Sequence, residues 1–483
     1  MSDSTAFEVG RLDATDQAAL VASGEAKPTE LVEWAIERAE ALNPSLNAIV
    51  APMYDHARAA AAAGPPTGPF TGVPMLVKDL VVEIPGWPFA EGSKFVHGLV
   101  SDFESELAAR FRRAGLVAMG RTNSPEFGMA PHCEPALWGA TRNPWNPDFT
   151  TAGSSGGSSA AVAAGIVPIA HANDAGGSIR YPASCCGLFG LKPTRARNPL
   201  GPEYAEALGG LAVEHVVTRS VRDSAASLDA TSGPAPGDPY WAPPPARPFV
   251  DEVGADPGRL RIVYSRITAE RTVAHPDCLA ALDSTLALLE SLGHEVTEAS
   301  FCGINERTGA AIGTLMSAST AWVRAYWVRR LGREPNPGEL EPATAALAEM
   351  GAKVSAGDFM LALDDLNVFR REMATFFDDV DLWLTPTVST PPLRLGVMSS
   401  GTDNDPFAGM SQAGDMIRYA GVIANITGNP AMSVPLFWND EGLPIGSHFL
   451  APFGDEATLL RLASQLEAAQ PWADRWPPIS VAT

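Results

Sequence analysis

The sequence predicts an α/β fold built around a buried, mostly parallel sheet. Short apolar segments alternate with longer segments of helical periodicity along most of the chain. Of the 483 residues, 46% are hydrophobic and 19% are charged, so the chain is globular and wholesale disorder is excluded. At about 150 residues per domain the length allows three domains, although a large α/β fold can also form one unit.

The N-terminal part is predicted to be helical. Residues 28–42 carry apolar side chains at helical spacing, and the Asn43-Pro44 pair is expected to end that helix. A second helix is predicted over 54–63. The passage 64–74 is rich in Gly and Pro, which favours turns over a regular element.

The alternation of strands and helices continues through the middle of the chain. Short apolar segments there predict strands, and longer segments predict helices. The predicted strands cover residues 73–77, 116–120 and 166–170. The predicted helices cover residues 104–114, 157–165 and 222–231.

The second half begins with a Pro-rich loop over 233–250 and is predicted to be helix-rich as far as about residue 380. The segment 396–415 is rich in Gly, Ser and Asp, which favours a loop. The predicted elements are strands at 259–264 and 382–385 and helices at 277–292, 314–331 and 456–469. No internal repeat is visible.

Charge and cysteine content restrict the function. The net charge of −22 repels phosphate groups, so binding to nucleic acid or to an anionic membrane is not expected. Cysteines without a CxxC pair favour neither a disulfide framework nor a thiolate metal site. We expect the cysteines to be buried core residues of a cytoplasmic protein, because neither an apolar leader nor a membrane span is visible. The cysteines are Cys133, Cys185, Cys186, Cys278 and Cys302.

The densest chemical signal lies between residues 150 and 194. Two Gly/Ser clusters occur there: GSSGGSS (153–159) leads into an Ala-rich helix, and DAGGSIR (174–180) holds paired glycines before a serine. A loop that leads into a helix presents free backbone N–H groups at the positive end of the helix dipole. Paired glycines let N–H groups approach a ligand closely, so the second cluster can form an oxyanion hole.

Three interpretations of these clusters compete on chemical grounds. A phosphate-binding loop needs GxxxxGK[ST], which neither cluster contains. A hydrolase nucleophile elbow, GxSxG, is present around Ser155, and it would need a downstream acid followed by His294 or His448. The third interpretation is a structural loop without a catalytic role.

Together with their surroundings, the two clusters resemble the amidase signature family. The resemblance also covers GVPMLVKDL (72–80), GRTNSPEFG (120–128), GATRNPWNP (139–147) and the C-terminal ITGNPAMSVP segment, so it spans most of the chain. Within the family, the sequence is most similar to the nylon-oligomer (6-aminohexanoate cyclic dimer) hydrolases and the metagenomic urethanases.

The resemblance implies a Ser–cis-Ser–Lys triad. Ser178 matches the nucleophile, Ser154 matches the bridging serine, whose peptide bond is cis in the family, and Lys78 matches the base. Lysine can act as a base near neutral pH only where burial lowers its pKa from about 10.4. Neutral Lys78 would then take a proton from Ser154, and Ser154 one from Ser178, so that an acyl-enzyme forms without histidine, metal or cofactor.

Residues around the nucleophile match supporting positions of the family. Backbone N–H groups before it match an oxyanion hole, which stabilises the charge that develops on a carbonyl oxygen. The residues matched to the oxyanion hole are Ala175, Gly176 and Gly177, together with the N–H of Ser178 itself. The supporting residues are Ser155, which could bond to triad members, and Asp174 and Arg180, which we expect to form an ion pair that shapes the loop.

The stretch after the Thr-Asn pair of GRTNSPEFG lines the acyl pocket in the family. Here this stretch is Gly128-Met129-Ala130, which is followed by Pro131 and His132 and is apolar apart from the histidine. An apolar pocket favours aryl or alkyl amides over glutamine. Further aromatic side chains could line the pocket or belong to the core, namely Trp138, Trp322, Tyr326 and Trp327.

The resemblance implies a single amidase signature domain whose large mixed β-sheet is flanked by helices on both faces. Loops and inserts on such a scaffold carry specificity, so the insert and the 396–415 loop are expected to select the substrate. The expected parts of the domain (1–483) are N-terminal helices (1–65), a catalytic core (66–232), a variable helical insert (233–380) and the C-terminal part of the core (381–483).

The sequence therefore predicts a serine amidohydrolase that cleaves C–N bonds of small apolar amides. Aryl amides, alkyl amides and nylon-type oligomers are the expected substrates, and carbamates and esters are further candidates. The expected partner is a small-molecule amide or carbamate, and the chain is expected to be a monomer or homodimer. Two alternatives stay open: the glutaminase subunit of a tRNA-dependent amidotransferase, and a catalytically silent binding homologue.

Overall fold

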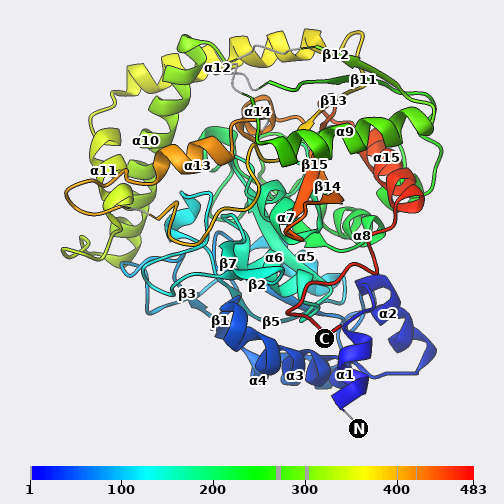
Figure 1. The fold of residues 1–483 in the computed structure, drawn as a ribbon. Coiled ribbons are helices and arrows are strands. Elements are labelled where there is room, and N and C mark those ends of the chain that lie inside the picture. Colours follow the sequence, from blue (N-terminus) through cyan, green and yellow to red (C-terminus); the bar gives the residue numbers. More distant parts are fainter. Residues whose placement is uncertain (1–2, 268–272, 300–303, 400, 420, 483) are drawn as a thin grey trace.

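The computed structural model describes residues 3–267, 273–299, 304–399, 401–419 and 421–482. Its centre is an eleven-stranded sheet in the order β1-β5-β2-β8-β10-β9-β14-β15-β13-β11-β12 (Figure 1). These strands are β1 (Ile49–Pro52), β2 (Pro74–Lys78), β5 (Val117–Thr122), β8 (Ile169–Asp174), β9 (Phe189–Lys192), β10 (Val213–Thr218), β11 (Arg261–Tyr264), β12 (Glu295–Glu298), β13 (Leu382–Pro386), β14 (Ala431–Trp438) and β15 (Pro444–Leu450). Two small sheets pair β3 (Pro88–Phe89) with β4 (Leu99–Val100) and β6 (Arg142–Asn143) with β7 (Asn146–Thr150).

Helices surround this sheet along the whole described chain. They are α1 (Asp3–Val9), α2 (Ala14–Ser23), α3 (Pro28–Leu46), α4 (Tyr54–Ala63), α5 (Glu106–Arg113), α6 (Gly156–Ala163), α7 (Arg180–Cys186), α8 (Val221–Thr231), α9 (Pro276–Ser291), α10 (Glu306–Leu331), α11 (Pro342–Gly351), α12 (Ala356–Phe376), α13 (Met410–Met416), α14 (Gly421–Thr427) and α15 (Glu456–Ala469). Among the described residues, no helix combines the length and the apolar composition that a membrane crossing requires.

The large sheet is mixed. Among its described strands, β2–β5, β2–β8, β11–β12 and β11–β13 pair in parallel, whereas the other six pairs are antiparallel. The mixed sheet implied by the resemblance is confirmed, and the mostly parallel sheet predicted from the alternation is wrong. Strands that are buried on both faces give continuous apolar segments in either direction, so their composition carries no information on strand direction.

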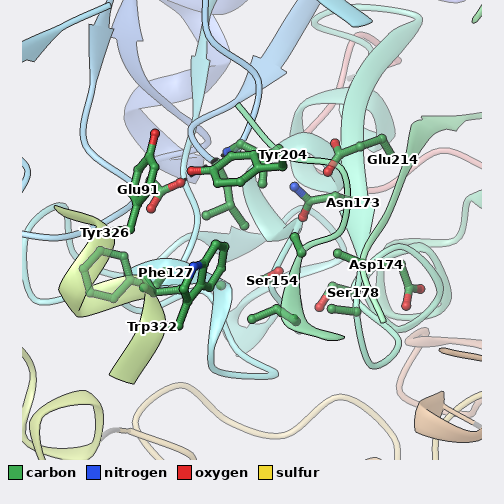
Figure 2. Close-up of a pocket in the computed structure, with 18 of the residues that line it drawn as sticks. Glu91, Phe127, Ser154, Asn173, Asp174, Ser178, Tyr204, Glu214, Trp322 and Tyr326 are labelled. Atoms are coloured by element: carbon green, nitrogen blue, oxygen red, sulfur yellow. Dashed lines mark hydrogen bonds between the residues drawn. The ribbon is translucent and has the colours of Figure 1, made fainter. Parts of the chain in front are cut away.

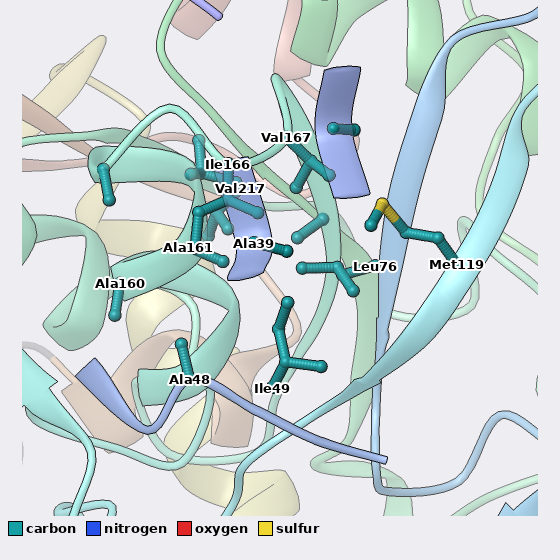
Figure 3. Close-up of a cluster of buried hydrophobic side chains, with 14 of the residues drawn as sticks. Ala39, Ala48, Ile49, Leu76, Met119, Ala160, Ala161, Ile166, Val167 and Val217 are labelled. Carbon is teal, nitrogen blue, oxygen red and sulfur yellow. The ribbon is translucent and has the colours of Figure 1, made fainter. Parts of the chain in front are cut away.

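Helices cover both faces, as the resemblance implied. Successive side chains of a strand point to opposite faces. On β2, Leu76 faces the cluster that holds Ala39 of α3 and Ala161 of α6, which Figure 3 shows around it. Its neighbours Met75 and Val77 face a second cluster on the opposite side. That cluster contains residues of α5, and α8 packs against it. The part of the sheet around β2 is therefore buried between two helical layers.

Several predicted elements differ in extent from those in the structure. The helix predicted at 314–331 begins earlier, at Glu306, as α10. The helix predicted to end at Asn43-Pro44 continues to Leu46, because Asn43 Oδ1 accepts the N–H groups of Ala48 and Ile49 and so closes the helix beyond the proline.

The strand predicted at 166–170 lies at 169–174 instead. The Ile166 N–H donates to Ala161 O, and the Gly165 N–H donates to Val162 O, so these residues close the preceding helix. The loop predicted at 396–415 is wrong in its last part, because residues 410–415 belong to α13. Residue 400 of this segment lies outside the described residues.

The segment 233–380 contributes both helices and strands. Helices α10, α11 and α12 pack together beside the sheet, and they are the yellow-green elements at one side of Figure 1. Strands β11 and β12 of the same segment complete one edge of the large sheet. The division of the domain into four parts stays a prediction.

The four described cysteines are buried free thiols, as expected for core residues. Burial raises the pKa of the Cys185 thiol to about 12, so this thiol is protonated and unreactive at neutral pH. The fifth, Cys302, lies outside the described residues.

Candidate active site

Lys78 is the last residue of β2 and is fully buried. The apolar side chains before it draw the strand into the interior, where the lysine has no access to water. Its Nζ lies 2.6 Å from Ser154 Oγ, 3.0 Å from Ser155 Oγ and 2.6 Å from Asn173 Oδ1. Burial lowers the pKa of Lys78 to about 7, so a large fraction of this amine is neutral near physiological pH.

Ser154 and Ser155 lie in the loop that leads into α6. The peptide bond between Gly153 and Ser154 is cis. A side chain at Gly153 would place its Cβ 2.3 Å from the carbonyl oxygen of His132, so only glycine fits there. Ser155 Oγ also donates to the carbonyl oxygen of Asn173 at 3.2 Å, and this contact fixes the loop against β8.

Ser178 lies in the turn between β8 and α7, beside Ser154. The Ser155 N–H donates to the Ser178 carbonyl oxygen at 3.3 Å, which joins the two Gly/Ser clusters. Figure 2 shows Ser154 and Ser178 next to each other at one side of a pocket, and both line that pocket. The three residues matched to the triad are thus brought together from β2, the loop before α6 and the turn after β8.

The turn around Ser178 is held by the carboxylate of Asp174. Its two oxygens accept the N–H groups of Gly177 at 2.7 Å and Ile179 at 3.1 Å. Arg180 forms the expected ion pair with Asp174, with an Nε–Oδ2 distance of 3.0 Å between fully buried side chains. Burial alone would raise the pKa of Asp174, but the Arg180 guanidinium outweighs it and holds that pKa well below its usual range.

The guanidinium of Arg180 has partners in the C-terminal part of the chain. It donates to the carbonyl oxygen of Gly421, to Asn425 Oδ1 and to His448 Nε2 at 2.7–2.9 Å. The contacts expected of Ser155, Asp174 and Arg180 are therefore present in the structure. Ser155 contacts Lys78, whereas Asp174 and Arg180 hold the turn around Ser178.

The backbone N–H groups at and before Ser178 differ in whether they already have a hydrogen-bond acceptor. The N–H of Gly177 is already donated to Asp174, whereas those of Ala175, Gly176 and Ser178 have no acceptor among the described residues. Gly177 has φ +121°, and a side chain there would place its Cβ 2.1 Å from the ring of Tyr181. The oxyanion hole of Ala175, Gly176 and Gly177 stays a prediction.

The pocket beside the two serines is largely apolar and encloses about 610 Å³, including its open mouth. Three aromatic side chains of α10 form one wall, as the sequence analysis allowed: Trp322, Tyr326 and Trp327. Of the predicted stretch 128–130, Gly128 lines this pocket, whereas Met129 packs beside Phe127 in an adjoining cluster. Neither Met129 nor Ala130 belongs to the described wall, and their contact with substrate stays a prediction.

Several pocket residues were missed by the sequence analysis. Asn173 directly precedes DAGGSIR on the predicted strand, so its position was visible although its bond to Lys78 was not. Glu91, Tyr204 and Glu214 also line the pocket, and all come from segments without a chemical motif. Only the fold brings such residues to the site.

The alternative of a nucleophile elbow at Ser155 lacks its histidine. His448 Nε2 contacts Arg180 Nη1, and His294 Nε2 contacts Gln465 Oε1. Ser155 Oγ instead contacts Lys78 and the backbone of Asn173. Within the described part of the chain, no group of three or more His, Cys, Asp or Glu side chains is arranged to hold a metal ion.

The comparisons with known proteins agree with this geometry. The family model described as Amidase matches residues 30–460, so the chain belongs to the amidase signature family and is an amidohydrolase. The chain is 37% identical over 477 residues to the 6-aminohexanoate-cyclic-dimer hydrolase of Paenarthrobacter ureafaciens, which covers 97% of this chain and 96% of that protein.

Solved structures give the same result. The structure of 6-aminohexanoate cyclic dimer hydrolase complexed with substrate matches with a TM-score of 0.93 at 36% identity and covers 97% of this chain and 99% of that one. A bacterial aryl acylamidase of the amidase signature family matches with a TM-score of 0.85 at 27% identity, covering 96% and 97%.

Proposed function

We propose that this chain hydrolyses small apolar amides through a covalent acyl-enzyme on Ser178, with Ser154 and Lys78 as a two-step proton relay. The observation that carries the proposal is the 2.6 Å contact between buried Lys78 Nζ and Ser154 Oγ beside Ser178. A lysine in this environment holds an unprotonated amine near pH 7, which is what a general base requires.

The relay moves one proton in each direction. Ser178 Oγ attacks the substrate carbonyl carbon and passes its proton to Ser154, while Ser154 passes its own proton to Lys78. The relay then runs backwards and protonates the leaving nitrogen as the C–N bond breaks. Water attacks the acyl-enzyme by the same route, releases the acid and restores Ser178.

The negative charge on the carbonyl oxygen needs donors in place before the reaction. The unpaired N–H groups of Ala175, Gly176 and Ser178 meet this requirement, and the N–H of Gly177 would be shared with Asp174. The Asp174–Arg180 ion pair positions this turn through the N–H groups that Asp174 accepts.

The pocket favours an apolar substrate. Leu80, Val81 and the α10 aromatic residues line it, so an aryl or alkyl group is better accommodated than the polar side chain of glutamine. Relatives named as a 6-aminohexanoate-cyclic-dimer hydrolase and an aryl acylamidase support amides of both kinds. Carbamates and esters present the same carbonyl to Ser178 and are proposed as further substrates.

A direct test measures 4-nitroaniline release from an apolar acyl anilide and 4-nitrophenol or 4-nitroaniline release from matched ester and carbamate substrates. The wild type should hydrolyse the anilide, and Ser178→Ala should reduce kcat by about a thousandfold or more. Arg113→Gln, at an exposed surface ion pair, serves as the control and should retain full activity. Faster hydrolysis of glutamine than of the anilide would instead favour the glutaminase alternative.

A further inference from the structure

The side of the pocket opposite the two serines contains a buried carboxyl group. Glu91 is 4% exposed and lines the pocket together with Tyr204 and Tyr326. Figure 2 shows these three side chains close together and separated from Ser154 and Ser178 by the width of the pocket. An acidic side chain in an otherwise apolar, aromatic wall is costly to bury and requires an explanation.

The carboxyl group of Glu91 accepts hydrogen bonds but has no positively charged partner among the described residues. Oε2 accepts the indole N–H of Trp327 at 2.7 Å, and Oε1 accepts the N–H of Val81 at 3.4 Å. Among the described residues, no lysine or arginine forms an ion pair with Glu91, and Arg330, which follows Trp327 on α10, pairs with Glu83 and Asp102. Burial raises the pKa of Glu91 to about 8, as expected for a carboxyl group without a positive partner.

The backbone at Glu91 adopts an unfavourable conformation that neighbouring contacts stabilise. Glu91 has φ +50°, a left-handed conformation that a residue with a side chain rarely adopts. Its carbonyl oxygen accepts the N–H of Phe127 at 2.8 Å, and the preceding Ala90 N–H donates to Asp79 Oδ1 at 3.1 Å. The fold therefore fixes the position from which the carboxyl group enters the pocket wall.

The surroundings suit a positively charged partner. The ring faces of Tyr and Trp attract a cation, and an adjacent carboxylate adds a direct ion pair. Tyr204 and Tyr326 lie with ring centroids 5.4 Å apart, and Tyr326 and Trp327 lie 5.0 Å apart, so aromatic surface continues around the carboxyl group. The net charge of −22 further favours the approach of a cation over an anion.

We propose that Glu91, with Tyr204 and Tyr326, forms a subsite that binds a primary amine at the far end of the substrate chain. The amine enters as an ammonium ion and pairs with the Glu91 carboxylate, and the proton that Glu91 holds at neutral pH in the free enzyme is released to solvent. Substrates with an apolar chain between the scissile bond and a terminal amine would contact both the serines and this subsite. This inference deepens the proposed amidase function and rests on it for its kinetic test.

The kinetic test compares 4-nitroanilides of ω-amino acids, over a series of chain lengths, with the anilides in which a methyl group replaces each amine. A second pair of amide substrates carries the amine or the methyl group on the part that leaves with the nitrogen of the scissile bond. In the wild type, kcat/KM should favour the amine at one chain length, and Glu91→Gln should lower that amine-to-methyl ratio by about tenfold or more. Glutamine still accepts the Trp327 N–H, so a merely structural role of Glu91 would leave the ratio unchanged.

Glu203→Gln is the matched control. Tyr326 donates its hydroxyl to Glu203 Oε2 at 3.4 Å, but Glu203 does not line the pocket. This variant should keep the wild-type ratio. An equal ratio in the wild type and in Glu91→Gln, for both substrate pairs, would overturn the proposal.

A binding measurement separates this proposal from the amidase function. Calorimetric titration with hexylamine should show binding to the wild type and to Ser178→Ala, and about tenfold or more weaker binding to Glu91→Gln. Hexanol should bind the wild type more weakly than hexylamine, which tests the subsite even if Glu91→Gln fails to fold. If the wild type hydrolyses no anilide but binds hexylamine in this pattern, the amidase proposal fails and the amine subsite stands. Equal binding of hexylamine and hexanol contradicts the subsite.

Discussion

At the scale of single residues, Lys78 gains its chemistry from its neighbours. A surface lysine is protonated at neutral pH, whereas Lys78 is enclosed at the end of a buried strand and surrounded by hydroxyl and amide oxygens. Asn173 is part of this environment, because its Oδ1 accepts a hydrogen bond from Lys78 Nζ.

The lowered pKa of Lys78 predicts a pH dependence of activity. Below about pH 7 the amine is protonated and cannot accept a proton, so kcat/KM should fall about tenfold for each further pH unit. Above pH 7 the amine is neutral and the rate should reach a plateau. A pH–rate profile with an uncharged anilide measures this, and a constant rate from about pH 5 to pH 9 would show that Lys78 is not the base.

The buried ion pair predicts a large effect on stability. Asp174→Asn would leave Arg180 charged and buried without its partner, so the free energy of unfolding should fall by about 3–5 kcal/mol. Chemical denaturation followed by circular dichroism measures this change. Glu33→Gln, which removes an exposed partner of Arg58, is the control and should leave the unfolding midpoint unchanged. Equal midpoints for Asp174→Asn and the wild type would contradict the structural role of the pair.

The sequence allowed the triad to be predicted but not the far side of the pocket. Lys78, Ser154 and Ser178 lie in the local motifs that carry the resemblance to the amidase signature family, and the resemblance implied their roles in the proposed triad. Glu91 stands in a segment with no such motif, and its burial depends on Trp327, more than 200 residues further along the chain. Long-range packing of this kind leaves no local pattern in a single sequence.

At the scale of elements, the turn between β8 and α7 depends on one glycine. Gly177 has a positive φ and lies against the Tyr181 ring, so any side chain there must displace the turn that carries Ser178. A displacement of about 1 Å can reduce catalysis about a hundredfold.

Two alanine variants test this role of the turn. Gly177→Ala should reduce kcat about a hundredfold or more, whereas Gly176→Ala should cost only a few-fold, because its added methyl group meets open space. Anilide hydrolysis by the two purified variants makes the comparison. Similar rates for both variants would show that the geometry of the turn does not control Ser178.

The direction of the strands could not be predicted from the sequence. The elements that the sequence predicted mostly lie within a few residues of their observed positions, because apolar periodicity and caps are local signals. Many strands and several helices of the structure were not predicted at all. The strands β10, β14 and β15 were not predicted, so their antiparallel pairing, β14 with β15 and β8 with β10, is visible only in the fold. Buried strands have the same composition in both orientations, so the predicted strands gave no signal of direction either.

At the scale of the whole molecule, the pocket is assembled from distant parts of the chain. The serines belong to the catalytic half, whereas Trp322, Tyr326 and Trp327 belong to α10 of the 233–380 segment. The sequence left open whether these aromatic residues line the pocket or belong to the core, and the fold places them in the pocket lining. Loops and inserts on a rigid core commonly carry specificity in this way.

This arrangement predicts separable effects on binding and on chemistry. Trp322 is 40% exposed, so Trp322→Ala should leave the fold intact, raise KM for a bulky aryl anilide about tenfold and change kcat little. A small acetyl anilide should be less affected. Met360→Ala, at an exposed position of α12 outside the pocket, is the control. An equal rise in KM for the large and the small substrate would show that α10 does not determine specificity.

Mass spectrometry of the protein during turnover would show whether Ser178 carries the acyl group. A slowly hydrolysed aryl ester or carbamate would be mixed with the enzyme, quenched in acid and digested. The account predicts one acyl group per chain, located on Ser178 and absent from Ser178→Ala. An acyl group on Ser154 or Ser155 that persists in Ser178→Ala would contradict it.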